Sequence, residues 1–178
     1  MTPGLEEARL ELHQAGYCVF CNRIVVRGED GSCEAGHPSE GIAGRILLAD
    51  GQEPPTLPRF NIAAFLLPMI WGPAHGQWAG AVFLPLWLFA DSIVRSAAGM
   101  GPAGRVAAAG AVAVTLAMAA FFGRRADGLG WRRVCDRVSV DEWAARQRVW
   151  AVVSVPVAAV LLGSAVYFNT VILPARGM

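Results

Sequence analysis

The sequence contains no lysine, and all fifteen of its basic side chains are arginines. A GC-rich genome explains this bias without any functional cause, because arginine codons can be GC-rich and lysine codons cannot, and it indicates a bacterial source. Charge of either sign is also scarce. Charged residues make up 16% of the chain and hydrophobic residues 54%, which excludes a typical soluble domain over the whole length.

Two kinds of signal are missing from the sequence. The first 17 residues have no basic segment followed by an apolar run, so we expect no secretory signal peptide and a cytoplasmic N-terminal part. The chain also lacks a glycine-rich phosphate loop, a nucleophile-elbow glycine–serine pattern and a paired His/Glu motif. We therefore expect a protein that is not an enzyme.

The distribution of charge divides the chain into two parts. Residues 1–59 carry nine acidic side chains and five arginines, a net charge of −4, and residues 60–178 carry five acidic side chains and ten arginines, a net charge of +5. The long apolar runs all lie in the second part. We predict a head over 1–49, a proline-rich linker over 50–59 and a helical membrane domain over 60–178. The negative head argues against a nucleic-acid partner, because phosphate binding needs positive charge.

A cysteine and histidine pattern predicts a metal site in the head. The spacing is C-x2-C-x11-C-x3-H, formed by Cys18, Cys21, Cys33 and His37. A β-rich run over 23–27 and turn residues over 28–31 predict a hairpin that returns the second ligand pair to the first. Three thiolates and one imidazole complete a tetrahedral shell with no open position, which is typical of one structural zinc ion. The expected head is a small zinc-ribbon β-hairpin.

Other interpretations of the cysteines are weaker. A disulfide framework needs an oxidising compartment, and a thioredoxin-like C-x-x-C needs a βαβ context that is missing here. Three unrelated cysteines remain the other alternative. The fourth, Cys135, is expected to be a free thiol. Elsewhere in the head, a short helix over Glu6–Gln14 and a strand or helix over 42–48 are expected.

The second part predicts an all-α membrane domain with three transmembrane helices and one interfacial or re-entrant helix. The apolar run over 60–71 would be about 18 Å long as a helix, short of the roughly 30 Å hydrocarbon core. Asn61 is its expected N-cap and Pro68 disrupts its last turn. We therefore place it at the interface, with a full span over 60–78 as the alternative. The three spans are expected at about 79–98, 105–122 and 149–173.

Polar and aromatic residues mark the expected membrane boundaries. Residues expected at the interface are Phe60, Asn61, Trp71, Trp78 and Trp143. Asp91 and Arg95 lie four residues apart on one helical face, late in the first span. They form either a half-solvated ion pair near the far interface or a buried pair that lines a proton or ion path.

An arginine-rich stretch over 123–148 predicts the topology. It holds seven arginines and four acidic residues, so the positive-inside rule assigns it to the cytoplasm. Within it, Ser139 begins a capping-box pattern. Three spans then place the head in the cytoplasm and the C-terminus outside a bacterial inner membrane, whereas four spans would place the head outside. With three spans the head and this stretch can touch.

Six residues carry a resemblance to a known group of proteins. They form the pattern F-N-x-x-A-F…P-x-x-W, with Phe60, Asn61, Ala64, Phe65, Pro68 and Trp71. Together with the cysteine–histidine pattern and the segment over 128–151, the chain resembles small bacterial membrane proteins of unknown function that combine a zinc ribbon with such a membrane domain. The resemblance covers most of the chain and implies no established catalytic activity.

These features favour a non-enzymatic accessory or scaffolding subunit of a membrane complex. Its expected partners are other membrane-protein subunits or a cytoplasmic protein, the lipid bilayer, and a second copy of the chain. One alternative is a transporter or ion-conducting subunit that uses His75, Asp91 and Arg95. Another is a membrane-tethered regulator.

Overall fold

The computed structural model describes residues 13–49, 52–97, 100–172 and 175. The chain forms two compact units. The first unit contains Met1–Pro58 and Gly128–Ala144, and the second contains Arg59–Asp127 and Ala145–Met178. The arginine-rich stretch thus contributes to the same unit as the cysteine-bearing head.

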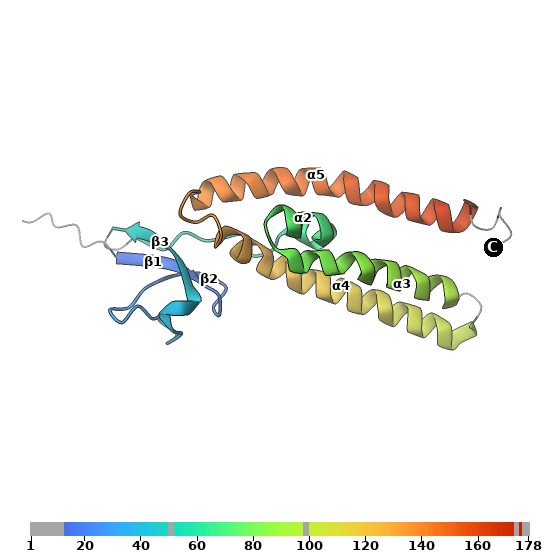
Figure 1. The fold of residues 1–178 in the computed structure, drawn as a ribbon, viewed down its shortest axis with the longest axis horizontal. Coiled ribbons are helices and arrows are strands. Elements are labelled where there is room, and N and C mark those ends of the chain that lie inside the picture. Colours follow the sequence, from blue (N-terminus) through green and yellow to red (C-terminus); the bar gives the residue numbers. More distant parts are fainter. Residues whose placement is uncertain (1–12, 50–51, 98–99, 173–174, 176–178) are drawn as a thin grey trace, which may run out of the picture. The chain divides into compact units, whose positions relative to one another are not determined.

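The first unit contains a three-stranded antiparallel sheet (Figure 1). Its strands are β1 (His13–Cys18), β2 (Arg23–Val26) and β3 (Ile42–Leu48), in the order β2-β1-β3. Strand β1 is central, pairing Tyr17 with Ile24 on one side and His13 with Leu48 on the other. A short 3-10 helix, η1 (Ser39–Gly41), precedes β3. The buried core of the sheet consists of Cys18, Val25, Cys33 and Ile42, with Cys21 packed against it.

The sheet corrects two local expectations. The predicted helix over Glu6–Gln14 is wrong for its last two residues, because His13 and Gln14 belong to β1 and pair with β3. The other residues of that prediction lie outside those that the structure describes. The predicted hairpin turn over 28–31 is present, but it returns the chain through an isolated bridge between Arg27 and Cys33 rather than a second strand. The strand that completes the sheet is β3, one of the two forms expected for 42–48.

Two short helices begin the second unit, α1 (Ile62–Leu66) and α2 (Pro68–Ala74). The Asn61 side chain caps α1 by accepting a hydrogen bond from the Ala64 N–H at 2.8 Å, as predicted. Pro68 divides the apolar run into two helices, because a proline has no N–H to donate to the preceding turn. It is the first residue of α2, a position where the missing N–H costs nothing.

Three helices are long and apolar enough to span a membrane. They cover Trp78–Ala97, Gly101–Trp131 and Val140–Ile172. The first consists of the 3-10 helix η2 (Trp78–Val82) and α3 (Phe83–Ala97), the second is α4 (Gly101–Trp131), and the third consists of α5 (Val140–Tyr167) and the π-helical turn η3 (Phe168–Ile172). The chain is therefore a small sheet followed by a mostly helical region with three long apolar helices.

Helices α4 and α5 extend beyond the predicted spans into the arginine-rich stretch. Helix α4 continues past residue 122 to Trp131, and α5 begins at Val140. Between Pro102 and Pro156 the sequence has no proline to stop a helix, and arginine is a good helix former. Ser139 caps α5, accepting a hydrogen bond from the Glu142 N–H at 3.2 Å.

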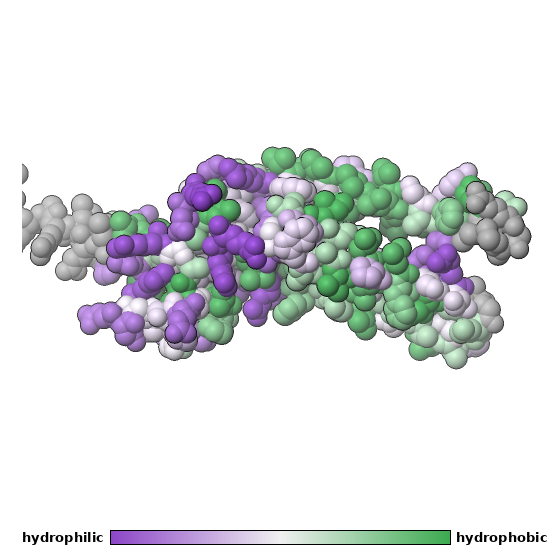
Figure 2. Space-filling model, in the orientation of Figure 1, coloured by the Kyte–Doolittle hydropathy of each residue, from purple (hydrophilic) through white to green (hydrophobic). Residues whose placement is uncertain are grey.

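Hydrophobic side chains cover much of the long helices (Figure 2). The two halves of α5 differ in burial. Val140, Trp143, Gln147 and Ser154 are buried, but among the described residues beyond Ser154, through Ile172, none is. We call the part of α5 beyond Ser154, residues 155–167, its outer half, and it presents apolar side chains on every side.

Candidate metal centre and buried polar network

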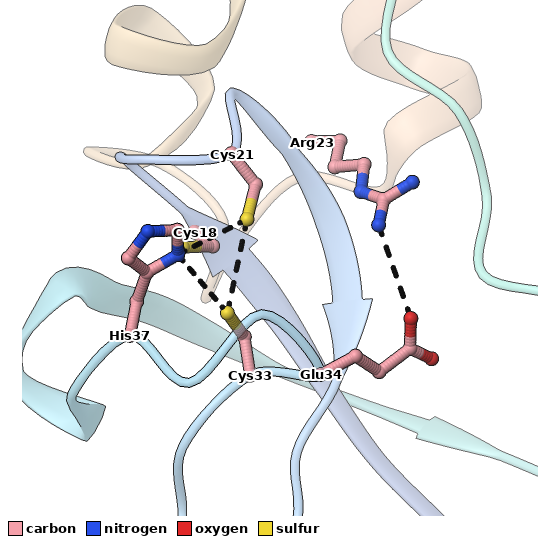
Figure 3. A network of polar contacts seen from close by, with 6 residues as sticks. All are labelled: Cys18, Cys21, Arg23, Cys33, Glu34 and His37. Carbon is pink, nitrogen blue, oxygen red and sulfur yellow. Dashed lines mark hydrogen bonds and ion pairs between the residues drawn. The ribbon is translucent and has the colours of Figure 1, made fainter.

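The four predicted metal ligands lie together in the first unit (Figure 3). Each offers one ligand atom, and these four atoms lie within 4.8 Å of one another. The Cys21 and Cys33 sulfurs are 3.7 Å apart, and Nδ1 of His37 lies 3.3 Å from Cys21 Sγ and 3.2 Å from Cys33 Sγ. Tetrahedral zinc with Zn–S of about 2.3 Å and Zn–N of about 2.0 Å requires separations of about 3.8 Å and 3.6 Å.

The backbone around the cysteines explains how short segments aim four ligands at one point. Cys18 ends β1, and the chain turns tightly so that the Asn22 N–H donates to the Cys18 carbonyl at 2.9 Å. Asn22 adopts a positive φ of 55°, a conformation that asparagine tolerates better than most residues. A second turn joins Cys33 to His37, whose carbonyl accepts from the Cys33 N–H at 3.1 Å.

The surroundings shift the thiol pKa values in opposite directions. Burial raises the pKa of Cys21 to about 11, and the neighbouring Cys18 and Cys33 sulfurs add to this effect. Burial also acts to raise the pKa of Cys33, but hydrogen bonds from the His37 and Ala35 backbone and from the His37 and Cys21 side chains lower it to about 6. Clustered thiols therefore disfavour a fully ionised shell unless a cation compensates the charge.

The immediate neighbours of the site orient its histidine. The Phe20 ring stacks on the His37 ring with centroids 5.0 Å apart, which holds the imidazole in place with Nδ1 toward the sulfurs. The ion pair between Arg23 and Glu34 at 3.8 Å is well exposed and so adds little stability. Three sulfurs and one nitrogen in this arrangement are compatible with one zinc ion, bound in a closed shell without a position for substrate.

A second cluster of polar side chains lies buried in the second unit, centred on Asn61. This side chain is 3% exposed. Its Oδ1 is already committed to the Ala64 N–H at the start of α1, so its Nδ2 faces the other way. The Nδ2 group donates to Oδ1 of Asp127 on α4 and to Oε1 of Gln147 on α5, both at 2.9 Å. One cap residue thus ties α1 to two long helices.

Gln147 extends this network to α2. Its Oε1 also accepts from the indole N–H of the fully buried Trp71 at 2.9 Å. Since an indole nitrogen only donates, the amide oxygen must face Trp71, and the Gln147 Nε2 then faces Nε2 of His75 at 3.3 Å. The His75 ring stacks on Trp71 with centroids 4.1 Å apart. We call Asn61, Trp71, His75, Asp127 and Gln147 the buried polar network.

Residues of the F-N-x-x-A-F…P-x-x-W pattern contribute to this network and to the contact between α1 and α4. Ala64 is fully buried, and the Phe60 and Phe65 rings pack 5.5 Å apart. Gly123 lets α1 approach α4 closely, because a Cβ there would lie 3.2 Å from both the Asn61 carbonyl and the Phe65 Cβ. The Asn61 N–H also donates to the Gly123 carbonyl at 2.9 Å. The pattern therefore builds the joint between the short helices and the long ones.

The residues predicted at the membrane interface take different positions. Phe60 is partly exposed and Trp78 is 73% exposed, whereas Asn61 and Trp71 are buried in the second unit. Trp143 is buried in the first unit. A headgroup location for these five residues stays a prediction.

Asp91 and Arg95 form the predicted ion pair, with 3.1 Å between Asp91 Oδ2 and Arg95 Nη2. Both side chains are close to half exposed. The pair has a third member that the sequence did not indicate, because Asn169 in η3 donates to Asp91 Oδ1 at 3.0 Å. His75 takes part in the buried polar network, so the three residues of the transport hypothesis belong to two different groups.

Gln147 and Asp127 are the network residues that the sequence reasoning missed. One signal could have found Gln147. It lies on the same helical stripe as Val140, Trp143 and Trp150, at spacings of three and four residues. A polar residue inside such an apolar stripe indicates a buried hydrogen bond. Asp127, on a helix with many small residues, has no comparable signal.

Comparisons with known proteins add no assignment. No family model matches the chain, and neither a curated protein nor a solved structure matches it.

Proposed function

We propose that this chain is a non-enzymatic accessory or scaffolding subunit of a membrane complex, with a zinc ribbon as its soluble head. It would belong to the group of small bacterial membrane proteins that it resembles. The helices Trp78–Ala97, Gly101–Trp131 and Val140–Ile172 would cross the bacterial inner membrane, and the helices over 62–74 would lie at its interface or enter it partly.

The observation that carries the accessory role is the free outer half of α5. In the most apolar 18-residue stretch of the helix Val140–Ile172, only 6% is buried within the chain. Transmembrane helices associate through close packing rather than through a hydrophobic driving force. A helix that packs so little within its own chain is available to a neighbouring subunit, which can be another membrane protein or a second copy.

The metal site supports a binding role for the head rather than a catalytic one. A Cys3His shell fills all four positions of tetrahedral zinc, so the ion would stabilise the small sheet without activating water. A sheet of three short strands has little apolar core, and a bound metal would supply the missing folding free energy.

The chain segments that make up the first unit support a cytoplasmic head. Residues 128–144 belong to the same compact unit as the head, and Tyr17 contacts Gly128 within it. The two segments would then lie on one side of the membrane, which requires an even number of crossings between them, as the helices Trp78–Ala97 and Gly101–Trp131 would provide. The arginine-rich stretch favours the cytoplasm, so the C-terminus would lie outside.

The test is purification of the tagged full chain in mild detergent, followed by quantification of co-purified subunits. We expect one partner, or a second copy, at fixed stoichiometry. Replacing Val160 and Leu162 together by alanine should release it, because both side chains are exposed on the outer half of α5. Val106→Ala, equally exposed but on α4, is the matched control. A monomer without a stoichiometric partner contradicts the proposal, as does a partner that the α5 change leaves bound.

A second candidate is a transporter or ion-conducting subunit, favoured by the cluster of Asp91, Arg95 and Asn169. Ionisable residues inside transmembrane segments are costly and often functional, and π-helical turns such as η3 frequently occur at functional sites. Asp91→Asn should abolish flux in proteoliposomes if this candidate is right. Unchanged flux, or none in the parent protein, would remove it. The membrane-tethered regulator is the third candidate.

A further inference from the structure

An apolar groove lies between α3 and α4 in the second unit. Its volume is about 420 Å³, within the range of small-molecule sites. Its lining contains no charged residue and consists of Ala79, Phe83, Ala117, Met118, Phe121 and Phe122. Met118 and Phe121 are both exposed, so the groove opens at the surface of the helices. An apolar groove between membrane helices has the shape and chemistry to hold an acyl chain.

A cation lies directly beside this groove. The Arg125 guanidinium sits over the Phe121 ring, 5.5 Å from its centroid. Arg125 follows Phe121 by one helical turn, or about 6 Å along α4. Arg124 is adjacent and exposed. Positive charge one turn from an apolar groove matches a phospholipid, whose phosphate lies just beyond its acyl chains.

An exposed tryptophan marks the same level on the neighbouring helix. Trp78 is 73% exposed and directly precedes Ala79, which lines the groove. Exposed tryptophans at the ends of membrane spans lie at headgroup depth. Trp78 and Arg125 therefore place the end of the groove where a lipid headgroup would lie.

We propose that this groove binds one acyl chain of an anionic phospholipid whose phosphate pairs with Arg125. The inference rests on the proposed membrane location. It adds a selective lipid site, because basic pockets between transmembrane helices recognise anionic headgroups. A zwitterionic lipid with the same chains would fill the groove but lose the net attraction to the guanidinium.

The test is a titration of the delipidated full chain in detergent with palmitoyl-oleoyl phosphatidylglycerol or phosphatidylcholine, with bound lipid counted by native mass spectrometry. We expect phosphatidylglycerol to bind about fivefold more tightly, the ratio that corresponds to about one arginine near a charged surface. Arg125→Gln should remove this preference. Arg105→Gln, at the other end of α4, should keep it.

A second pair of variants tests the groove itself. Ala117→Phe should weaken both lipids, because the ring fills the space of the acyl chain, whereas Ala109→Phe on the same helix should not. Equal affinity for the two lipids, a preference that survives Arg125→Gln, or full binding to Ala117→Phe overturns the inference. Alkaline carbonate extraction of cell membranes separates the two proposals. A chain that is extracted contradicts the membrane location, and a chain that resists extraction but shows no preference contradicts this inference alone.

Discussion

The side-chain amide nitrogen of Gln147 lies 3.3 Å from Nε2 of His75, and this contact fixes the protonation state of the histidine. The His75 Nδ1 lies 2.8 Å from the Trp71 carbonyl, which can only accept, so Nδ1 carries the proton. The Gln147 amide cannot turn round, because its oxygen accepts from Asn61 and Trp71. Nε2 of His75 must therefore accept a hydrogen bond, and the ring is neutral.

The first prediction follows for the pH dependence of stability. Burial lowers the pKa of His75 below its ordinary value of 6.5, and the hydrogen bond to the Trp71 carbonyl offsets only part of this shift. Below about pH 6.5 the unfolded chain then binds more protons than the folded chain. The free energy of unfolding should fall as the pH drops from 6.5 to the lower pKa of the folded state.

His75→Phe provides the comparison for this prediction. It keeps a ring to stack on Trp71 but has no titrating group, so its thermal unfolding midpoint in detergent should depend less on pH between 7.5 and 5.5. Loss of zinc at low pH affects both proteins and cancels in the difference. The network also links Asp127, a titrating group, to His75 through Asn61 and Gln147. Asp127 is present in both the parent protein and His75→Phe. Parallel pH profiles would contradict the prediction.

The second prediction separates the network from helix capping. Aspartate is as good an N-cap as asparagine, so capping alone predicts that Asn61→Asp is harmless. In the network, however, it places a carboxylate oxygen against Oδ1 of Asp127 and Oε1 of Gln147, where an N–H now donates. We expect a loss of about 3 kcal/mol or more, exceeding that of Asn61→Ala.

Two further variants check the cause of this loss. Ser139→Asp makes a similar change at the exposed N-cap of α5 and should alter stability by no more than about 0.5 kcal/mol. Combining Asn61→Asp with Asp127→Asn restores a donor opposite the new carboxylate and should recover part of the loss. Chemical denaturation in detergent measures the free energy of unfolding of the parent protein and of these variants. A double variant no more stable than Asn61→Asp would contradict the assignment.

These contacts show which parts of the structure a single sequence can predict. The Asn61 cap and the break at Pro68 are local signals that the structure confirms. The spacing from Cys18 to His37 is also a local signal, and the four side chains lie close together, which is compatible with one zinc site. The partners of Asn61 lie 66 and 86 residues away, and no periodicity encodes which distant polar groups meet. Hydropathy also marks where a membrane ends rather than where a helix ends, so α4 continues beyond the predicted span to Trp131.

The third prediction concerns the metal. Purified protein should contain about one zinc per chain, and Cys21→Ser should lose it, because the remaining three ligands cannot close the shell. Cys135→Ser is the matched control, since this thiol lies outside the ligand cluster and donates to the Arg132 carbonyl at 3.2 Å. Metal analysis by mass spectrometry measures both variants. Full zinc retention by Cys21→Ser, or its loss from Cys135→Ser, would contradict the assignment of the ligands.

The fourth prediction tests the topology with thiol labelling. The first turn of α4 is expected outside the cell, so Ala103→Cys in a Cys135→Ser background should react with a membrane-impermeant maleimide in spheroplasts. In the parent protein Cys135 lies between α4 and α5 and is expected in the cytoplasm, so it should react only after the membrane is permeabilised. Because Cys135 also packs near Gly44 and burial raises its pKa, Arg133→Cys in the Cys135→Ser background offers an exposed site in the same segment. If this site is labelled in intact spheroplasts and Ala103→Cys is not, the head lies outside and the predicted orientation is reversed.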